Sequence, residues 1–321
     1  MKTSIVHEII YNLLLKTVKY RGQNKLINRI WTLASNYSTN RYKGPVTTKI
    51  HGFKVIVNNG FSYPFYARLF PKYNNPLIQL VFSVHAYLGR KVSFIDVGSA
   101  VGDTNLLLIK NLPETIEKIY CIEGDLEFYE YLNVNKKYFP DNETYNVLLG
   151  DSDEGMVKSL VKTHLGTASS IGLENAETIS LDKLLYSKLT QNIDIIKIDV
   201  DGFDGKVLNG CSKILSKYKP YVIFEWHPIL LEKTNNSYFQ HFEFLKLHGY
   251  NRFLWFTKYG EFSHFDFDCT TELLEAYVKL CLRNNHDFDW HYDIIAIHKE
   301  STIDIFEIAE MKKAKAIKSR F

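Results

Sequence analysis

Between residue 91 and about residue 300, short apolar segments alternate with longer segments whose apolar residues recur every three to four positions. Strands that alternate with helices in this way predict a mainly parallel, doubly wound α/β sheet. The seven predicted strands span residues 92–97, 119–123, 144–149, 193–200, 221–226, 252–256 and 293–298. The predicted helices between them span residues 103–111, 126–138, 203–218, 238–247 and 271–283. Ligands of such sheets bind beyond the carboxyl ends of the strands, so the residues there are the candidate site.

The first 90 residues have a different pattern. Residues 4–20 place apolar side chains such as Ile5, Ile9 and Leu13 on one helical face, and a second helix is expected at 25–35. The first helix fits a basic membrane-surface or partner helix, and it equally fits a cap on the fold or an oligomer contact. Residues 46–70 predict a β-hairpin with Asn58-Asn59-Gly60 as its turn, and residues 75–88 predict a helix.

These patterns divide the chain into four parts. We expect a basic helical extension at 1–45, a hairpin and helix leading into the core at 46–90, the α/β domain at 91–300 and a basic tail at 301–321. Residues 1–50 hold nine Lys or Arg side chains and a single acid, Glu8, although the whole chain carries only +3. The middle is therefore acidic, which argues against nucleic-acid binding and leaves the ends as candidate contacts for anionic surfaces.

Cysteine usage and hydropathy indicate the compartment. The four cysteines are far apart and form no C-x-x-C pair, so zinc ribbons and iron–sulfur sites are not supported and a reducing cytoplasm is the simplest setting. Residues 9–15 are apolar but lack a cleavage site, so no signal peptide is expected. No run approaches the roughly 18–20 apolar residues of a spanning helix. We expect a cytoplasmic protein that is at most peripheral at the inner membrane face.

A glycine turn follows the first predicted core strand, in Phe94-Ile-Asp-Val-Gly-Ser-Ala-Val-Gly-Asp-Thr104. Gly98 and Gly102 allow positive φ and close approach of a ligand to the backbone, beside the free N–H groups of a helix start. The spacing D-x-G-x-x-x-G differs from the dinucleotide fingerprint G-x-G-x-x-G, so a nicotinamide cofactor is not expected. The turn points instead to another adenosyl ligand, S-adenosylmethionine.

Acids and one histidine stand at the ends of the next strands. Glu123 could accept hydrogen bonds from two ribose hydroxyls, and Asp151 could reach the adenine amine, although both could also be solvated turn acids. Strand alternation places Lys197, Asp199 and Asp201 on one face, where they either form a structural ion pair or line the site. Glu225 and His227 share the next strand end. A histidine there could be a general base, or it could be structural.

These stretches resemble the FkbM family of S-adenosylmethionine-dependent methyltransferases over roughly residues 90–300. The resemblance is carried by Phe94-Ile-Asp-Val-Gly-Ser-Ala-Val-Gly102, Asn146-Val-Leu-Leu-Gly-Asp151, Ser180-Leu-Asp-Lys-Leu-Leu185 and Ile193-Asp-Ile-Ile-Lys-Ile-Asp-Val-Asp-Gly-Phe-Asp204 through Val207-Leu-Asn-Gly210. The family usually has Glu where this chain has Asp201, and often Glu at Asp204, so a role that needs the longer side chain is in doubt. The first 45 residues lie outside the resemblance.

The resemblance implies O-methyl transfer to a hydroxyl, often on a sugar of a polysaccharide, glycolipid or other natural product; a nucleotide sugar would fit as an acceptor too. Its implied cofactor residues are Asp96, Gly98, Gly102, Glu123 and Asp151. Its implied acceptor-facing residues are Asp199, Glu225 and His227. We expect His227 to act as the base, with Asp199 as second choice or as the group that orients it. Trp226, Trp255 and Trp290 could stack on sugar rings, although large aromatics at strand ends are more often core.

Three alternatives remain open from the sequence. Asp199-Val200-Asp201 is a D-x-D pattern, which a metal-dependent glycosyltransferase could use to hold a nucleotide-sugar diphosphate. A methyltransferase could instead bind magnesium through Asp199 and Asp201, so a divalent metal is left undecided. A non-enzymatic scaffold would keep the cofactor fold while its basic ends bind a membrane or a partner. Whether the chain forms a homo-oligomer is also left open.

Overall fold

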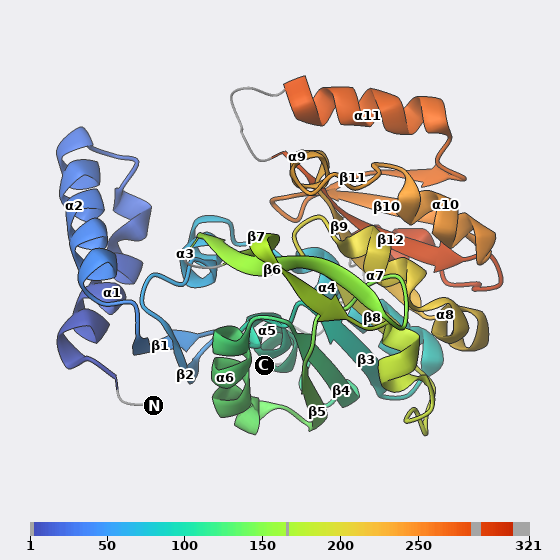
Figure 1. Cartoon of the computed structure of the whole chain (residues 1–321), viewed down its shortest axis with the longest axis horizontal. Coiled ribbons are helices and arrows are strands. Elements are labelled where there is room, and N and C mark those ends of the chain that lie inside the picture. The colour runs from blue at the N-terminus through green and yellow to red at the C-terminus, as the bar shows by residue number, and fades with distance from the viewer. Residues whose placement is uncertain (1–2, 165–166, 284–289, 311–321) are drawn as a thin grey trace.

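The computed structural model describes residues 3–164, 167–283 and 290–310. Its centre is an eight-stranded sheet in the order β11-β10-β12-β9-β8-β3-β4-β5, with helices on both faces (Figure 1). Strands β9, β8, β3, β4 and β5 pair in parallel, and β12 is antiparallel to both of its neighbours. The strands span β3 Val92–Val97, β4 Ile116–Glu123, β5 Asp141–Asn146, β8 Ile195–Ile198, β9 Tyr221–Trp226, β10 Tyr250–Thr257, β11 Phe262–Phe267 and β12 Tyr292–His298. The predicted doubly wound fold is confirmed, with one strand more than expected.

The helices of the core follow the predicted order. They span α4 Asn75–Leu88, α5 Asp103–Asn111, α6 Leu126–Asn135, α7 Asp204–Asn209, α8 Ser212–Tyr218, α9 Pro228–Lys233, α10 Gln240–Leu247 and α11 Thr271–Arg283. The single helix predicted at 203–218 is wrong, because α7 and α8 are separated at Gly210 and Cys211. A Cβ on Gly210 would lie 2.2 Å from the carbonyl oxygen of Gly150, so the chain bends where it meets the loop after β5.

Two strands pair outside the central sheet and were not predicted. Strands β6 (Gly155–His164) and β7 (Thr167–Thr178) form an antiparallel ribbon that pairs only with itself among the described residues. The ribbon fills the segment between β5 and a short helical turn, Asp182–Tyr186.

The N-terminal part packs onto one face of the sheet. It consists of α1 Ile5–Thr17, a short 3₁₀ turn, α2 Lys25–Arg41, β1 Pro45–Ile50, β2 Phe53–Asn58 and α3 Tyr63–Leu69. The hairpin of β1 and β2 is confirmed, but its turn is His51-Gly52, with φ of 50° and 93°, and Asn58-Asn59-Gly60 leads out of it. Val46, Val55 and Val57 share one hydrophobic core with Phe94 of β3.

The start of the predicted basic tail is also packed. Helix α12 (Ile305–Glu310) lies against α4, where Ile308 is buried and Ser83 Oγ donates a hydrogen bond to the Glu307 carbonyl at 3.3 Å. The rest of that tail, residues 311–321, lies outside the described residues. The four cysteines are buried free thiols. Within the described ranges, no helix has both the length and the apolar character needed to cross a membrane.

Candidate functional site

The glycine turn joins β3 to α5 and leaves no room for side chains at its two glycines. Gly98 has φ of 77°, and a Cβ there would lie 1.9 Å from the carbonyl oxygen of Asp199. Gly102 has φ of 86°, and a Cβ there would lie 2.5 Å from Cζ of Phe139. Both positions therefore require glycine. At Gly98 the missing side chain lets the glycine turn lie directly against the residue that follows β8.

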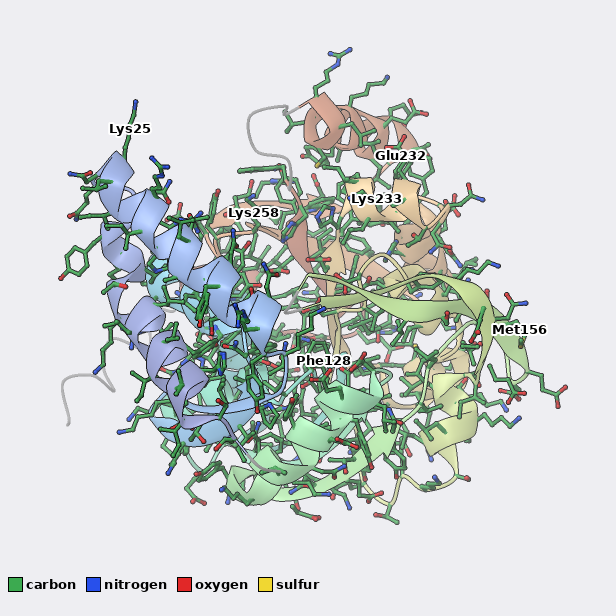
Figure 2. All side chains as sticks on the ribbon, turned by 60° about the vertical axis from the view of Figure 1, so that its left-hand side comes forward. Lys25, Phe128, Met156, Glu232, Lys233 and Lys258 are labelled. Atoms are coloured by element: carbon green, nitrogen blue, oxygen red, sulfur yellow. The ribbon has the colours of Figure 1, made fainter. Side chains whose placement is uncertain are left out.

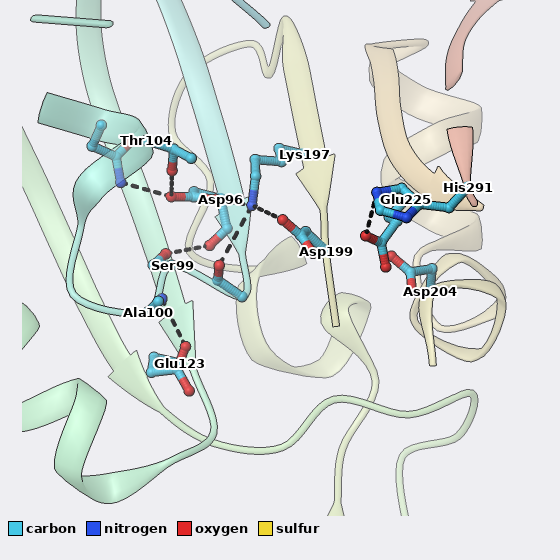
Figure 3. Close-up of polar contacts among 12 residues, drawn as sticks. Asp96, Ser99, Ala100, Thr104, Glu123, Lys197, Asp199, Asp204, Glu225 and His291 are labelled. Atoms are coloured by element: carbon cyan, nitrogen blue, oxygen red, sulfur yellow. Dashed lines mark hydrogen bonds and ion pairs between the residues drawn. The ribbon is translucent and has the colours of Figure 1, made fainter. Parts of the chain in front are cut away.

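Glu123 lies across this turn, at the end of β4. Its Oε2 accepts a hydrogen bond from the Ala100 N–H at 2.8 Å (Figure 3). Its Oε1 accepts one from the Asp125 N–H at 2.7 Å. Burial raises the pKa of Glu123 to about 7, although the two backbone hydrogen bonds act in the opposite direction. The carboxyl group is held in one orientation, with further lone pairs on each oxygen for ribose hydroxyls.

Asp96 lies beneath the turn. The side chain is fully buried, with Oδ1 at 3.2 Å from Lys197 Nζ and Oδ2 accepting a hydrogen bond from Asn105 Nδ2 at 2.7 Å. Because none of its surface is exposed, direct contact with a cofactor, as the sequence implied, does not fit this geometry. Asp96 instead braces the glycine turn through Lys197 and α5.

Lys197 links the turn to the end of β8. Its Nζ lies 3.2 Å from Asp96 Oδ1 and 3.4 Å from Asp199 Oδ2, and Figure 3 shows it between the two acids. Burial by itself would lower the pKa of Lys197, but the charges of Asp96, Asp199 and Asp103 raise it, so the amine stays charged. The sequence allowed either a structural ion pair or a lining of the site on this strand face. Lys197 does form the ion pair, and its partner Asp199 also lines a pocket.

That pocket opens beyond the ends of β8 and β9, with Asp199 at its edge. Half of the Asp199 side chain is exposed (48%), whereas Lys197 is buried. The other polar residues that line the pocket are Asn74, Lys197, Glu225 and Asp293. The carboxylate of Asp199 is both exposed and next to the glycine turn, so it is suited to receive a proton from a bound hydroxyl group.

Two further carboxyl groups lie near Asp199: that of Asp204, which is fully buried, and that of Glu225, which is largely buried. Glu225 Oε2 and Asp204 Oδ1 have no hydrogen-bond partner among the described residues, and Figure 3 shows the two side chains next to each other. Burial, followed by the charge of Asp199, raises the pKa of Glu225 well above its usual range. Glu225 also lines the pocket, so its unpartnered Oε2 is available to a hydroxyl group bound there.

His227 is placed differently from the predicted base. It precedes α9, where its Nδ1 accepts a long hydrogen bond, 3.4 Å, from the Leu230 N–H, and it is buried. Its ring stacks on His291 at 4.6 Å between centroids, and His291 Nε2 lies 3.4 Å from Glu225 Oε1. His227 is not among the residues that line the pocket, whereas Asp199 is. The geometry therefore favours Asp199, the second choice from the sequence.

Asp151 lies in an exposed loop, because β5 ends at Asn146 rather than at the predicted residue 149. In the part of the chain that the structure describes, no hydrogen bond or ion pair involves its carboxylate. Its proposed contact with adenine stays a prediction.

Asp201, just past the end of β8, has φ of 52°. No group of three His, Cys, Asp or Glu side chains among the described residues is arranged to hold a metal ion, and the predicted pair Asp199 and Asp201 stays undecided.

Replacing Asp204 with Asn is expected to flatten the pH dependence of folding stability between about pH 4 and pH 8. Burial, and then the charge of Asp199, raises the pKa of Asp204 from 3.8 to about 8. In that window the folded protein binds more protons at this group than the unfolded chain, so stability falls as pH rises. Urea titrations at both ends of the window measure the slope. Asp151→Asn, at an exposed acid, should keep the wild-type slope, and an unchanged slope in Asp204→Asn would contradict the prediction.

The sequence analysis missed two side chains of the site. Tyr73 lies in the loop before α4, and burial, followed by the charges of Asp199, Asp293 and Glu225, raises its pKa. Asp293 stands directly opposite Glu225 in the register of β12 and β9, and burial raises its pKa to about 6. An antiparallel last strand begins at the edge where the parallel strands end, so the position of Asp293 could have been predicted from the sequence. No pattern in the sequence indicates that Tyr73 belongs to the site.

Residues 84–252, more than half of the chain, match the family model of the methyltransferase FkbM domain. The chain belongs to the FkbM methyltransferase family. The methyl donor of this family is S-adenosylmethionine, and the glycine turn with Glu123 across it fits that cofactor. Membership does not support the glycosyltransferase alternative, in which Asp199-Val200-Asp201 holds a nucleotide sugar.

Solved structures similar to this FkbM chain are distant. Methyltransferase FkbM from Methylobacillus flagellatus KT is 14% identical, with a TM-score of 0.35 over 64% of this chain and 43% of its own. Precorrin-6y C5,15-methyltransferase from Geobacter metallireducens GS-15 is 13% identical, with a TM-score of 0.34 over 65% and 81%. An O-methyltransferase from Bacillus cereus in complex with SAH is 11% identical, with a TM-score of 0.38 over 70% and 80%. A search of curated proteins gives no match.

Proposed function

We propose that this protein transfers a methyl group from S-adenosylmethionine to a hydroxyl oxygen of a sugar or glycan. The observation that carries the proposal is the position of Asp199: its backbone touches the glycine turn at Gly98, and its half-exposed carboxylate borders the pocket. A proton acceptor is thus next to the place where a donor methyl would be held. Family membership supports methyl transfer, and the choice of an oxygen acceptor rests on this carboxylate.

In the proposed reaction the chain's residues mainly position and deprotonate the acceptor. S-adenosylmethionine supplies a methyl group already activated on a sulfonium, which leaves as S-adenosylhomocysteine. Asp199 accepts the hydroxyl proton as the new C–O bond forms, a contribution that is typically about 10²–10⁴-fold. Glu225, which also lines the pocket, binds a second hydroxyl of the acceptor. Holding the acceptor in line with the methyl group can supply up to about 7–11 kcal/mol.

A series of aromatic rings that begins at Tyr73, next in sequence to the pocket residue Asn74, supports a sugar as acceptor. Neighbouring ring centroids are 4.6–6.3 Å apart along Tyr73, Tyr66, Phe70, Tyr259 and Trp290. Such rings offer flat apolar surface, and Tyr and Trp add a polar edge, which together suit the two faces of a sugar ring.

Of the three tryptophans at predicted strand ends, only Trp290 keeps this role in the proposal. Trp226 and Trp255 are fully buried in the core. Trp290 is half-buried beside Tyr259.

Replacing Glu123 with Gln is expected to weaken binding of S-adenosylhomocysteine by about 10-fold or more. Glutamine keeps the size of the side chain but removes a charge-assisted hydrogen bond to ribose, worth about 1.5–3 kcal/mol. Calorimetric titration of the two proteins with S-adenosylhomocysteine measures the difference. Glu130→Gln, on the exposed side of α6, is the matched control and should bind as the wild type does.

The outcomes of this titration separate two claims. If the wild type does not bind S-adenosylhomocysteine, the proposed function fails. If the wild type and Glu123→Gln bind equally well, only the ribose assignment fails.

The acceptor class is then tested by incubation with S-adenosylmethionine and a panel of sugars, glycolipids and nucleotide sugars. Mass spectrometry of the products should find the added methyl group on a sugar oxygen, and methylation of nitrogen or carbon alone would contradict the proposal.

A further inference from the structure

Helices α1 and α2 form a hairpin that projects from one end of the molecule (Figure 1). Its inner side is fixed to the body: Tyr11 and Leu15 are buried in the core, and Tyr11 Oη donates a hydrogen bond to the Phe61 carbonyl at 2.8 Å. The two helices are tied together by Trp31 Nε1, which donates to the Leu14 carbonyl at 3.0 Å. The hairpin is therefore a fixed part of the fold, and α1 does act as a cap.

The outer side of the same hairpin is apolar and exposed. Ten of the 21 exposed large hydrophobic side chains among the described residues lie between Ile5 and Tyr37, about a tenth of the chain. Helical spacing gathers most of them into one stripe on each helix, with exposed fractions of 56–73%. The stripes consist of Ile5, Ile9 and Leu13 on α1, and of Leu26, Ile30, Leu33 and Tyr37 on α2. Single exposed apolar residues are ordinary, but such a concentration marks a contact surface.

The charge around these stripes is of one sign. Residues 1–50 carry nine Lys or Arg side chains, and Lys16, Lys25, Arg29 and Arg41 are exposed on the two helices. Figure 2 turns the hairpin forward and shows Lys25 extending away from the body. The one acid of this part, Glu8, is turned toward β1, where its Oε2 accepts a hydrogen bond from the Thr47 N–H at 3.2 Å.

We propose that the outer side of the α1–α2 hairpin docks this protein onto the surface of an anionic lipid bilayer. Apolar side chains flanked by Lys and Arg are the combination that lies in a membrane interface, with the apolar part among acyl chains and the cations against headgroups. A second copy of the chain is a poorer occupant, because it would bring an equally positive surface against this one. The proposal rests on this surface alone and does not depend on the acceptor of the methyl group.

The test is co-sedimentation of the full chain with vesicles of phosphatidylcholine alone and with vesicles that contain phosphatidylglycerol. The wild type should bind the anionic vesicles at low salt, bind neutral vesicles at least tenfold more weakly, and lose most binding in high salt. The variant Lys25→Gln/Arg29→Gln should lower the partition constant by roughly tenfold or more. The variant Ile30→Gln/Leu33→Gln should lower it as well, because it removes apolar surface without removing charge.

The control is Leu247→Gln, which changes a side chain on α10 that is 83% exposed. It should bind vesicles as the wild type does. Light scattering without lipid completes the experiment. A monomer that binds anionic vesicles supports the proposal, and a dimer that the Ile30→Gln/Leu33→Gln variant splits, with no binding to vesicles, overturns it in favour of a second copy. Equal binding of the wild type and both hairpin variants would also overturn it.

Discussion

Replacing Asp199 with Asn should lower kcat for methyl transfer by about 10²–10⁴-fold, the usual contribution of a positioned base. Asparagine has nearly the same size and keeps an oxygen toward Lys197, so the ion pair is weakened while the shape of the pocket is kept. The amide, however, cannot take the proton of the acceptor hydroxyl. Binding of S-adenosylhomocysteine should change by no more than a few fold, because the contact with Gly98 is made by the backbone of residue 199. Single-turnover methyl transfer, together with calorimetry, measures both quantities.

Asp201→Asn is the matched comparison, because it alters an acid two residues further along the same strand end. Asparagine tolerates the positive φ of 52° at this position, so the backbone should be unaffected. We expect it to lower kcat less than tenfold. If both variants lose activity equally and the wild type requires magnesium, the metal interpretation of Asp199 and Asp201 replaces the base. If Asp199→Asn keeps full activity while His227→Ala loses it, the base is His227 after all.

The parts of the fold that the sequence predicted well are those in which burial is strong and the ends are marked. Strands β3 and β9 and helices α4, α5 and α11 have the predicted bounds. The two strands consist almost entirely of buried residues. Helix α4 ends at Leu88 and is capped by Gly89, whose φ is 66°, and α5 begins after Gly102. Local pattern and tertiary packing agree at these places, so the sequence is sufficient.

The elements that were missed are held by pairing rather than by burial. Strand β11 is an edge strand with four of its six residues exposed, so only its hydrogen bonds to β10 define it. Strand β5 is likewise half exposed along its length, and its bounds were displaced for that reason. The ribbon of β6 and β7 has no partner beyond itself among the described residues. Pairing between strands depends on the folded chain, so the local spacing of apolar and polar residues does not predict it.

Motifs that carry the family resemblance also divide into two physical kinds. Asp182, from Ser180-Leu-Asp182, accepts hydrogen bonds from the N–H groups of Lys213 and Ile214 at 2.7 and 3.0 Å, and so caps the start of α8. Gly210 permits the close contact with Gly150. These residues hold the fold, whereas Asp199, from the motif at residues 193–204, borders the pocket. Sequence alone identified all of these stretches, but only their burial and partners distinguish supporting residues from candidates for chemistry.

Replacing Gly98 with Ala should remove both cofactor binding and methyl transfer, and should destabilise the fold by about 2–6 kcal/mol. Positive φ alone costs a non-glycine residue about 1–3 kcal/mol. The added Cβ would also lie 1.9 Å from the Asp199 carbonyl oxygen, so the turn and the end of β8 must separate, and overpacking of this kind costs a further 1–3 kcal/mol or so. The same movement displaces the proposed base from the methyl donor. Urea denaturation and titration with S-adenosylhomocysteine measure the two effects.

Gly89→Ala separates strain from steric contact. Gly89 also has positive φ, 66°, but a Cβ there would meet nothing within 4 Å. It should therefore lose stability through strain alone and keep the wild-type affinity for S-adenosylhomocysteine. The difference between the two alanine variants then isolates the contact between Gly98 and Asp199. If the two variants lose equal stability and both still bind and turn over, that contact does not couple the cofactor turn to the base, and the arrangement proposed for catalysis is wrong.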